Sequence, residues 1–135
     1  MESRTFDVST GSREAVVDVT GHCADFARAV GGDGLLHVFV PHATAGVAVL
    51  ETGSGSEEDL LGALQDLLPA DDRWRHAHGS RGHGRSHVMP ALVPPYATIP
   101  VIDGRLQLGM WQSICVVDVN VDNARRTVRL SLLRG

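Results

Sequence analysis

One stretch of the chain decides the fold: residues 35–51, with the sequence LLHVFVPHATAGVAVLE. Two apolar runs, 35–40 and 47–50, flank a short polar segment. Both runs are short and rich in β-branched residues, which is typical of buried strands. His37 interrupts the first run, and we interpret it as a satisfied core or interface histidine. His42 lies directly after this run, on a loop at a strand end, where functional side chains are common.

Similar patterns on both sides of this stretch predict further elements. An apolar stripe predicts a helix at about 21–30, capped by the hydroxyl of Thr20. Ser54 and Glu57 have capping-box spacing and open a leucine-striped helix that ends at Pro69. The other expected strands are 4–9, 14–19, 98–102, 105–108, 112–119 and 126–133. The pattern predicts one α+β domain over residues 1–135, with an irregular segment at 71–96.

The composition restricts the function. All twelve basic side chains are arginine, so a lysine nucleophile or Schiff base is excluded. The net charge is −4 with no basic tract, so we expect no nucleic-acid partner. Cys23 and Cys115 fall in apolar patterns and are expected to be buried free thiols. The chain opens on no apolar signal stretch and contains no membrane-length run, so we expect a cytoplasmic protein without a membrane partner.

Histidines provide the strongest chemical signal. Five of the seven fall between residues 42 and 87: His42, His76, His78, His83 and His87. Neutral imidazole is a common ligand of zinc and titrates near neutral pH. The pairs at 76 and 78 and at 83 and 87 have suggestive spacing, but neighbouring glycines argue against a helix at 83–87. A metal site and a solvated histidine-rich loop both remain open on these residues alone.

Four further residues are candidates for chemistry. Glu51 ends the second buried strand, where a carboxylate can ligate a metal or act as acid or base. Asp59 lies in the first turn of the leucine-striped helix, and Gln112 offers an amide at the start of a strand. Trp111 is a core, interface or substrate anchor. Taken singly, each is first explained by a structural role: a surface charge for Glu51, a helix N-terminal charge for Asp59, a strand-edge amide for Gln112 and a core or interface anchor for Trp111.

Together these residues resemble the YjbQ family, also called the secondary thiamine-phosphate synthase family. The resemblance runs over nearly the whole chain. The matching motifs are, in order, His42-x-Thr44-Ala45-Gly46, Glu51, Asp59, Trp74-x-His76, Ser86-His87, Ile99-Pro100-Val101, Asp103-Gly104, Leu108-Gly109-x-Trp111-Gln112 and Arg126. His83 departs from the family's usual asparagine and Met110 from its usual threonine, so ligand number and substrate choice are open at these positions.

The resemblance implies an antiparallel β-sandwich with two helices, assembled as a homotrimer, with a site near subunit boundaries. The expected catalytic residues are His42, Glu51, Asp59 and Gln112. The expected substrate-binding residues are Thr44, Arg81, Arg85, Trp111 and Arg126. The expected metal ligands are His42, His76, His83 and His87.

The implied activity is the coupling of a pyrimidine pyrophosphate with a thiazole phosphate. That chemistry needs cations on the leaving pyrophosphate, normally magnesium and arginines. A histidine-rich site suits zinc better than magnesium, which prefers oxygen ligands. A zinc-assisted hydrolase or lyase acting on a small phosphorylated or carboxylated substrate is therefore an alternative. A non-catalytic trimer that binds a metal or an anion is another.

Overall fold

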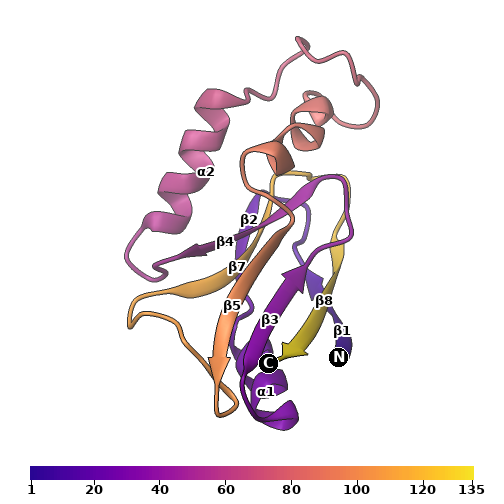
Figure 1. The fold of residues 1–135 in the computed structure, drawn as a ribbon. Coiled ribbons are helices and arrows are strands. Elements are labelled where there is room, and N and C mark those ends of the chain that lie inside the picture. The colour runs from indigo at the N-terminus through magenta and orange to yellow at the C-terminus, as the bar shows by residue number, and fades with distance from the viewer.

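The computed structural model describes residues 1–135 and shows two antiparallel sheets with two α-helices (Figure 1). The strands are β1 Glu2–Ser9, β2 Ala15–Asp18, β3 Gly34–Phe39, β4 Ala45–Leu50, β5 Tyr96–Ile102, β6 Arg105–Leu106, β7 Ser113–Asp118 and β8 Arg125–Arg134. The helices are α1 Thr20–Val30 and α2 Ser56–Leu67, followed by the 3₁₀ turns η1 His83–His87 and η2 Met89–Ala91. The expected α+β sandwich is confirmed. Neither α-helix combines the length and the apolar character needed to cross a lipid bilayer.

The sheets have the strand orders β1-β8-β3-β5-β6 and β2-β7-β4. Central strand β7 is buried on both faces. Ile114 and Val116 pack in the main core between the sheets, with side chains of α1. Val117 packs on the other face in a second cluster with Leu64 of α2 and Met89 of η2. This two-sided burial explains why the strand reads as a continuous apolar run.

Strand β8 is buried on one face only, because its side chains alternate between the core and the solvent. Val128, Leu130 and Leu132 are buried in the main core, as their alternation predicts. Arg129 is exposed and Ser131 half-buried on the opposite face. The strand pairs with both β1 and β3 over most of its length, which places its first residues beside the loop after β3.

Both predicted helix caps are wrong in detail. Thr20 is the first residue of α1, and its hydroxyl donates a 2.6 Å hydrogen bond to the carboxylate of Asp18 instead of capping the helix. Helix α2 starts at residue 56, and Ser54 makes no capping bond. The carboxylate of Glu57 instead accepts the backbone N–H of Gly53 at 3.0 Å. At both helix starts a nearby carboxylate accepts local hydrogen bonds, and the predicted hydroxyl caps do not form.

Residues 71–96 lie over one end of the sheets, as the pink to orange segment of Figure 1 shows. The expectation that glycines exclude a helical turn here is wrong, because η1 includes both late histidines of the segment. Gly84 lies inside this turn for a packing reason: a Cβ there would overlap the side chain of Trp74 and the carbonyl of His76. The absence of a side chain lets the turn pack closely on its own preceding segment.

The two cysteines are free and buried, as expected. Burial raises the pKa of the Cys23 thiol to about 12. Burial likewise raises the pKa of Cys115 to about 12. Both therefore stay protonated at neutral pH and act as small apolar side chains in the packing.

Candidate metal centre

Four histidines converge at the end of the molecule covered by residues 71–96. One ring nitrogen from each of His76, His78, His83 and His87 lies within 4.8 Å of all the others. The Nε2 atoms of His83 and His87 are 3.1 Å apart, and those of His76 and His78 face each other. A tetrahedral zinc with Zn–N bonds of about 2.0–2.1 Å separates its ligand nitrogens by about 3.3 Å. The separation of the His83 and His87 nitrogens is therefore close to that of a zinc site, and the other two nitrogens lie within 4.8 Å of them.

Asp122 orients the histidine group from a distant part of the chain. Its Oδ2 accepts a 2.7 Å hydrogen bond from Nδ1 of His83. A carboxylate only accepts hydrogen bonds, so this contact puts the proton of the imidazole on Nδ1 and leaves the lone pair of Nε2 facing the group. The same oxygen also accepts the backbone N–H and the hydroxyl of Ser80. The loop after β7 thus holds the histidine segment in place.

Burial and the neighbouring rings favour the neutral form of two of the four histidines, His76 and His87. Desolvation, and then the neighbouring imidazoles of His78 and His83, lower the pKa of His76 below its ordinary value of 6.5. Burial, and then His76, lower the pKa of His87 in the same way. These rings therefore hold free lone pairs at neutral pH and for some distance below pH 6.5. Neutral imidazole is the form that binds zinc.

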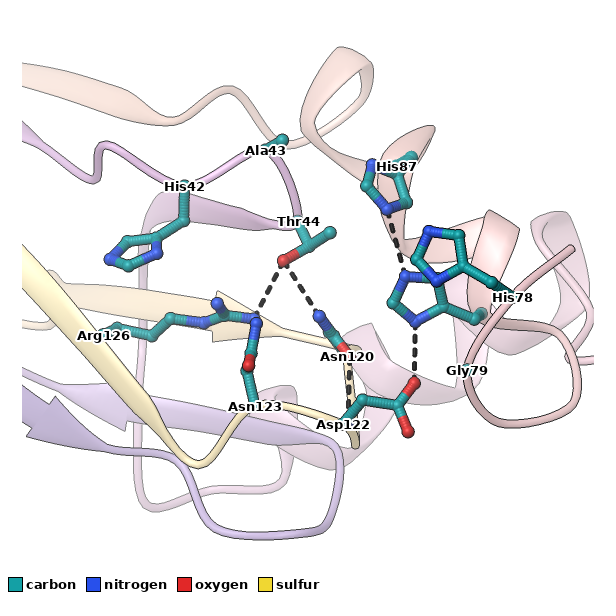
Figure 2. A pocket seen from close by; sticks show the side chains of 11 residues that line it. His42, Ala43, Thr44, His78, Gly79, His87, Asn120, Asp122, Asn123 and Arg126 are labelled. Atoms are coloured by element: carbon teal, nitrogen blue, oxygen red, sulfur yellow. Dashed lines mark hydrogen bonds and ion pairs between the residues drawn. The ribbon is translucent and has the colours of Figure 1, made fainter. Parts of the chain in front are cut away.

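A cavity of about 360 Å³ opens between this group and the ends of the sheets (Figure 2). His78 and His87 lie on one side in this view, and His42 and Arg126 on the other. Only one of the residues that line the cavity is hydrophobic. The residues at the cavity are His42, Ala43, Thr44, His78, Gly79, His83, His87, Asn120, Asp122, Asn123 and Arg126.

His42 lies at the cavity but outside the histidine group, so its expected place among the metal ligands is corrected. Its Nε2 accepts the backbone N–H of Thr127 at 2.9 Å, since β8 runs beside the loop after β3. Burial, followed by the positive charge of Arg126, lowers the pKa of His42 below 6.5. His78 takes the fourth position of the group. The two-residue spacing of His76 and His78 was the signal for it in the sequence.

Buried polar side chains connect the two sides of the cavity. Nε and Nη2 of Arg126 donate to the two carboxylate oxygens of Asp118 at 2.7 and 3.0 Å, and both side chains are almost fully buried. Nη2 also donates to the hydroxyl of Thr44, which accepts a second bond from the amide of Asn120. The amide oxygen of Asn120 accepts the backbone N–H of Asp122. This network fixes Arg126 at the cavity wall, and sequence reasoning missed its asparagine and aspartate members.

The other two predicted arginines lie away from this cavity. Arg85 is buried, and its Nη1 forms an ion pair with Glu14 of the loop before β2, while its Nε and Nη2 have no partner. It lines a separate hollow with Arg81, and its role in substrate binding stays a prediction. Arg81 is exposed and lies 3.5 Å from the carboxylate of Asp72, beside a separate hollow next to the histidine group. Of the three, only Arg126 reaches the cavity itself.

The remaining predicted residues lie at the opposite end of the smaller sheet. Glu51 follows the last residue of β4, roughly 20 Å from Thr44 at about 3.3 Å per residue. Leu50 pairs with Ser113 across the sheet, so Trp111 and Gln112 lie at this same end. Asp59 is exposed in the first turn of α2 and does not line the cavity. Within one chain, therefore, this second group of predicted residues does not meet the histidines.

The fold and the site define a small α+β sandwich protein with an imidazole-rich cavity at one end of its sheets. The chain belongs to the family described as UPF0047 protein YjbQ-like, whose model matches residues 4–135. The UPF0047 protein Rv2556c of Mycobacterium tuberculosis is 56% identical over 135 residues, which cover 100% of both chains. The UPF0047 protein MJ1081 of Methanocaldococcus jannaschii is 32% identical over 111 residues, 81% of this chain and 78% of the relative.

Solved structures give the same result for the fold. The crystal structure of the hypothetical protein APE1520 from Aeropyrum pernix K1 matches with a TM-score of 0.89 and 37% identity over 100% of both chains. A YbjQ-like protein from Sulfolobus solfataricus, SSO2532, matches with a TM-score of 0.91 and 23% identity, covering 99% of this chain and 97% of that one. The second likeness supports the fold alone.

Proposed function

We propose that this protein is a zinc-dependent enzyme that acts on a small anionic substrate in the cavity beside the histidine group. The observation that carries the proposal is the convergence of four imidazole nitrogens within 4.8 Å, with His83 oriented by a carboxylate. Three of these nitrogens would be enough to hold a catalytic zinc, whose fourth position is open to water or substrate. Such carboxylate–histidine pairs are typical of zinc ligands. The donors are all nitrogen, which fits zinc and does not fit magnesium. A zinc ion held there would supply a Lewis acid for the reaction.

The chain's own residues suit the other tasks of such an enzyme. His42 accepts a backbone N–H on Nε2, so its neutral ring carries the proton on Nδ1 and offers a donor to a bound substrate. The network around Arg126 fixes the opposite wall and keeps its geometry without a substrate. A cavity of about 360 Å³ lies at the small end of the range typical of ligand sites. Hydrolysis or elimination on a small substrate fits this site.

Thiamine-phosphate synthesis is a second candidate activity, favoured only by the family resemblance. Its leaving pyrophosphate would need several cationic partners. Arg81 and Arg85 line a separate hollow, so Arg126 is the only arginine at the cavity. The arrangement of cations therefore supports this activity less well than a reaction on a smaller anion.

We further propose that the protein works as a homotrimer in which the end of one subunit bearing Glu51 and Trp111 approaches the histidine group of another. Trp111 is 70% exposed and Met110 is 86% exposed in the single chain, and large apolar side chains grouped in this way are typical of an interface. Such an assembly would bring a carboxylate and the Gln112 amide to a site that lacks them within one chain.

Elemental analysis of purified protein tests the metal centre. We expect about one zinc per chain, and we expect His76→Ala and His87→Ala each to abolish stoichiometric binding because each removes one inward-facing nitrogen. His22→Ala is the matched control, since His22 is exposed and stacks on Phe6 far from the group in sequence. Unchanged zinc in both site variants would refute the centre.

X-ray absorption spectroscopy of the zinc-loaded protein separates the enzyme from a non-catalytic binding protein. Three nitrogens with one oxygen ligand would leave an exchangeable position, as in catalytic zinc sites. Four nitrogens and no oxygen would indicate a closed site, and would favour a role in metal binding or structure alone.

A further inference from the structure

The wall of the cavity opposite the histidine group presents a hydrogen-bond donor that the proposed metal centre does not use. Arg126 has a side chain that is 1% exposed, and its Nε and Nη2 are bound to Asp118 and Thr44. Its third nitrogen, Nη1, makes no hydrogen bond within the chain, although Arg126 lines the cavity. A guanidinium that is fixed on two sides and open on the third is preorganised for one oxyanion.

Two neighbours extend this donor set. His42 has its Nε2 occupied by Thr127, so Nδ1 is the free, protonated nitrogen of the neutral ring. Asn123 lines the same cavity, and its side-chain amide has no partner within the chain. Figure 2 shows His42, Arg126 and Asn123 on the same side of the cavity. Three side chains with free donors, from the loop after β3, from β8 and from the loop before β8, thus line the same cavity.

The charges around the cavity set the charge of the ligand. The guanidinium of Arg126 is compensated by Asp118, which is fully buried behind it. Asp122 adds a negative charge beside the histidine group. A divalent cation held by the histidine group would make the charge of the cavity more positive by two. An anion at Arg126 is therefore attracted more strongly by the loaded cavity than by the empty one.

We propose that Arg126, His42 and Asn123 form a subsite for one carboxylate or one singly charged phosphate group, and that anion and metal binding in this cavity are coupled. This inference rests on the proposed function, because the coupling requires the metal centre. It narrows the substrate to a small polar monoanion whose charged group lies away from the histidines. A diphosphate would leave excess negative charge beside Asp122 with no further cation in the chain's own cavity.

Calorimetric titration of zinc-loaded and zinc-free protein with acetate, inorganic phosphate and pyrophosphate tests the subsite. We expect acetate or phosphate to bind the loaded protein at one equivalent, in about the millimolar range for so few atoms. We expect the zinc-free protein to bind roughly tenfold more weakly, within the usual range for coupled sites. Pyrophosphate should bind no more tightly than phosphate. A preference for acetate or for phosphate separates a carboxylate substrate from a phosphorylated one.

Asn123→Asp is the variant of choice, because it places a carboxylate beside Arg126 on an exposed loop and leaves the buried ion pair intact. We expect it to keep its zinc and to lose at least about tenfold in anion affinity. Gln107→Glu adds the same charge on an exposed residue that does not line the cavity, and should change neither quantity.

The outcomes separate this subsite from the metal centre. Zinc uptake with no anion binding, or with equal anion binding in Asn123→Asp, would overturn the subsite and leave the proposed function standing. Anion binding that is equally strong without zinc would overturn the coupling. Anion binding by a chain that takes up no zinc would overturn the coupling and the proposed function together. Tighter binding of pyrophosphate than of phosphate would overturn the assigned charge class.

Discussion

At the scale of single residues, Asp122 orients the histidine group, although the sequence did not single it out. One carboxylate oxygen of Asp122 accepts hydrogen bonds from both His83 and Ser80. The backbone N–H of Ser80 makes the largest contribution to lowering the pKa of Asp122 below its ordinary value. Asp122 therefore stays ionised well into the acidic range and keeps His83 in one tautomer. A lone aspartate in a polar loop carries no sequence signal for this role.

Asp122→Asn should lower zinc affinity by roughly 10–100-fold, because removing the carboxylate lowers the basicity of His83 and frees its ring. Competition with a chromogenic chelator measures the affinity. Asp72→Asn is the control, since the side chain of Asp72 is 82% exposed and pairs only with Arg81 at 3.5 Å. Equal zinc affinities in the two variants would show that Asp122 does not orient a ligand.

At the scale of elements, the turn η1 depends on the residue before it. Gly82 has φ of 76°, and a Cβ there would overlap the backbone of Ala70 and Asp71. The close approach places η1 against the end of the segment that follows α2, and so fixes where His83 and His87 point. Two constraints, left-handed backbone and close packing, therefore act at the same residue.

Gly82→Ala should destabilise the protein by about 1–3 kcal/mol and weaken zinc binding, because the turn must shift to admit a methyl group. Thermal unfolding and zinc titration measure the two effects. Gly11→Ala is the matched control: Gly11 has φ of 69° with open space around its Cα, so only the backbone strain of about 1–2 kcal/mol applies. If both variants bind zinc like the parent, η1 does not depend on this contact.

At the scale of the whole molecule, the predicted site residues are divided between two ends. The histidine group and Arg126 lie at one end of the smaller sheet, and Glu51 and Trp111 at the other. A strand cannot bend to bring its own two ends together, so one chain cannot assemble all of these residues. Assembly with a second copy is the arrangement in which both sets would serve one site.

Light scattering at micromolar concentration should give the mass of a trimer, and Trp111→Glu should reduce it to that of a monomer with an unchanged circular dichroism spectrum. The side chain is 70% exposed in the single chain, so its loss should weaken an interface without disturbing the core. Leu67→Glu, at a residue 67% exposed on α2, is the control for a charge introduced on an apolar surface. A monomeric parent protein would rule out the shared site.

The sequence by itself determined most of the fold. Alternating apolar and polar residues predicted strand β8, and a continuous apolar run predicted β7. The two patterns differ because β8 is buried on one face and β7 on both. Asp103-Gly104 marked the β5–β6 turn, and both residues have positive φ there. The two α-helices were found with their ends displaced by one or two residues, but the 3₁₀ turn η1 was not expected. Local sequence patterns predict local backbone structure and burial, and most elements of this fold are set by such local preferences.

Only the tertiary structure decided the site. The contact between His83 and Asp122 joins residues 39 positions apart, and no pattern in the chain links them. Arg85 and Arg126 look alike in the sequence, but Arg85 pairs with Glu14 away from the cavity, whereas Asp118 holds Arg126 at the cavity. Hydrogen bonds between distant loops depend on how the sheets and the 71–96 segment pack, and that packing is set by the whole chain at once.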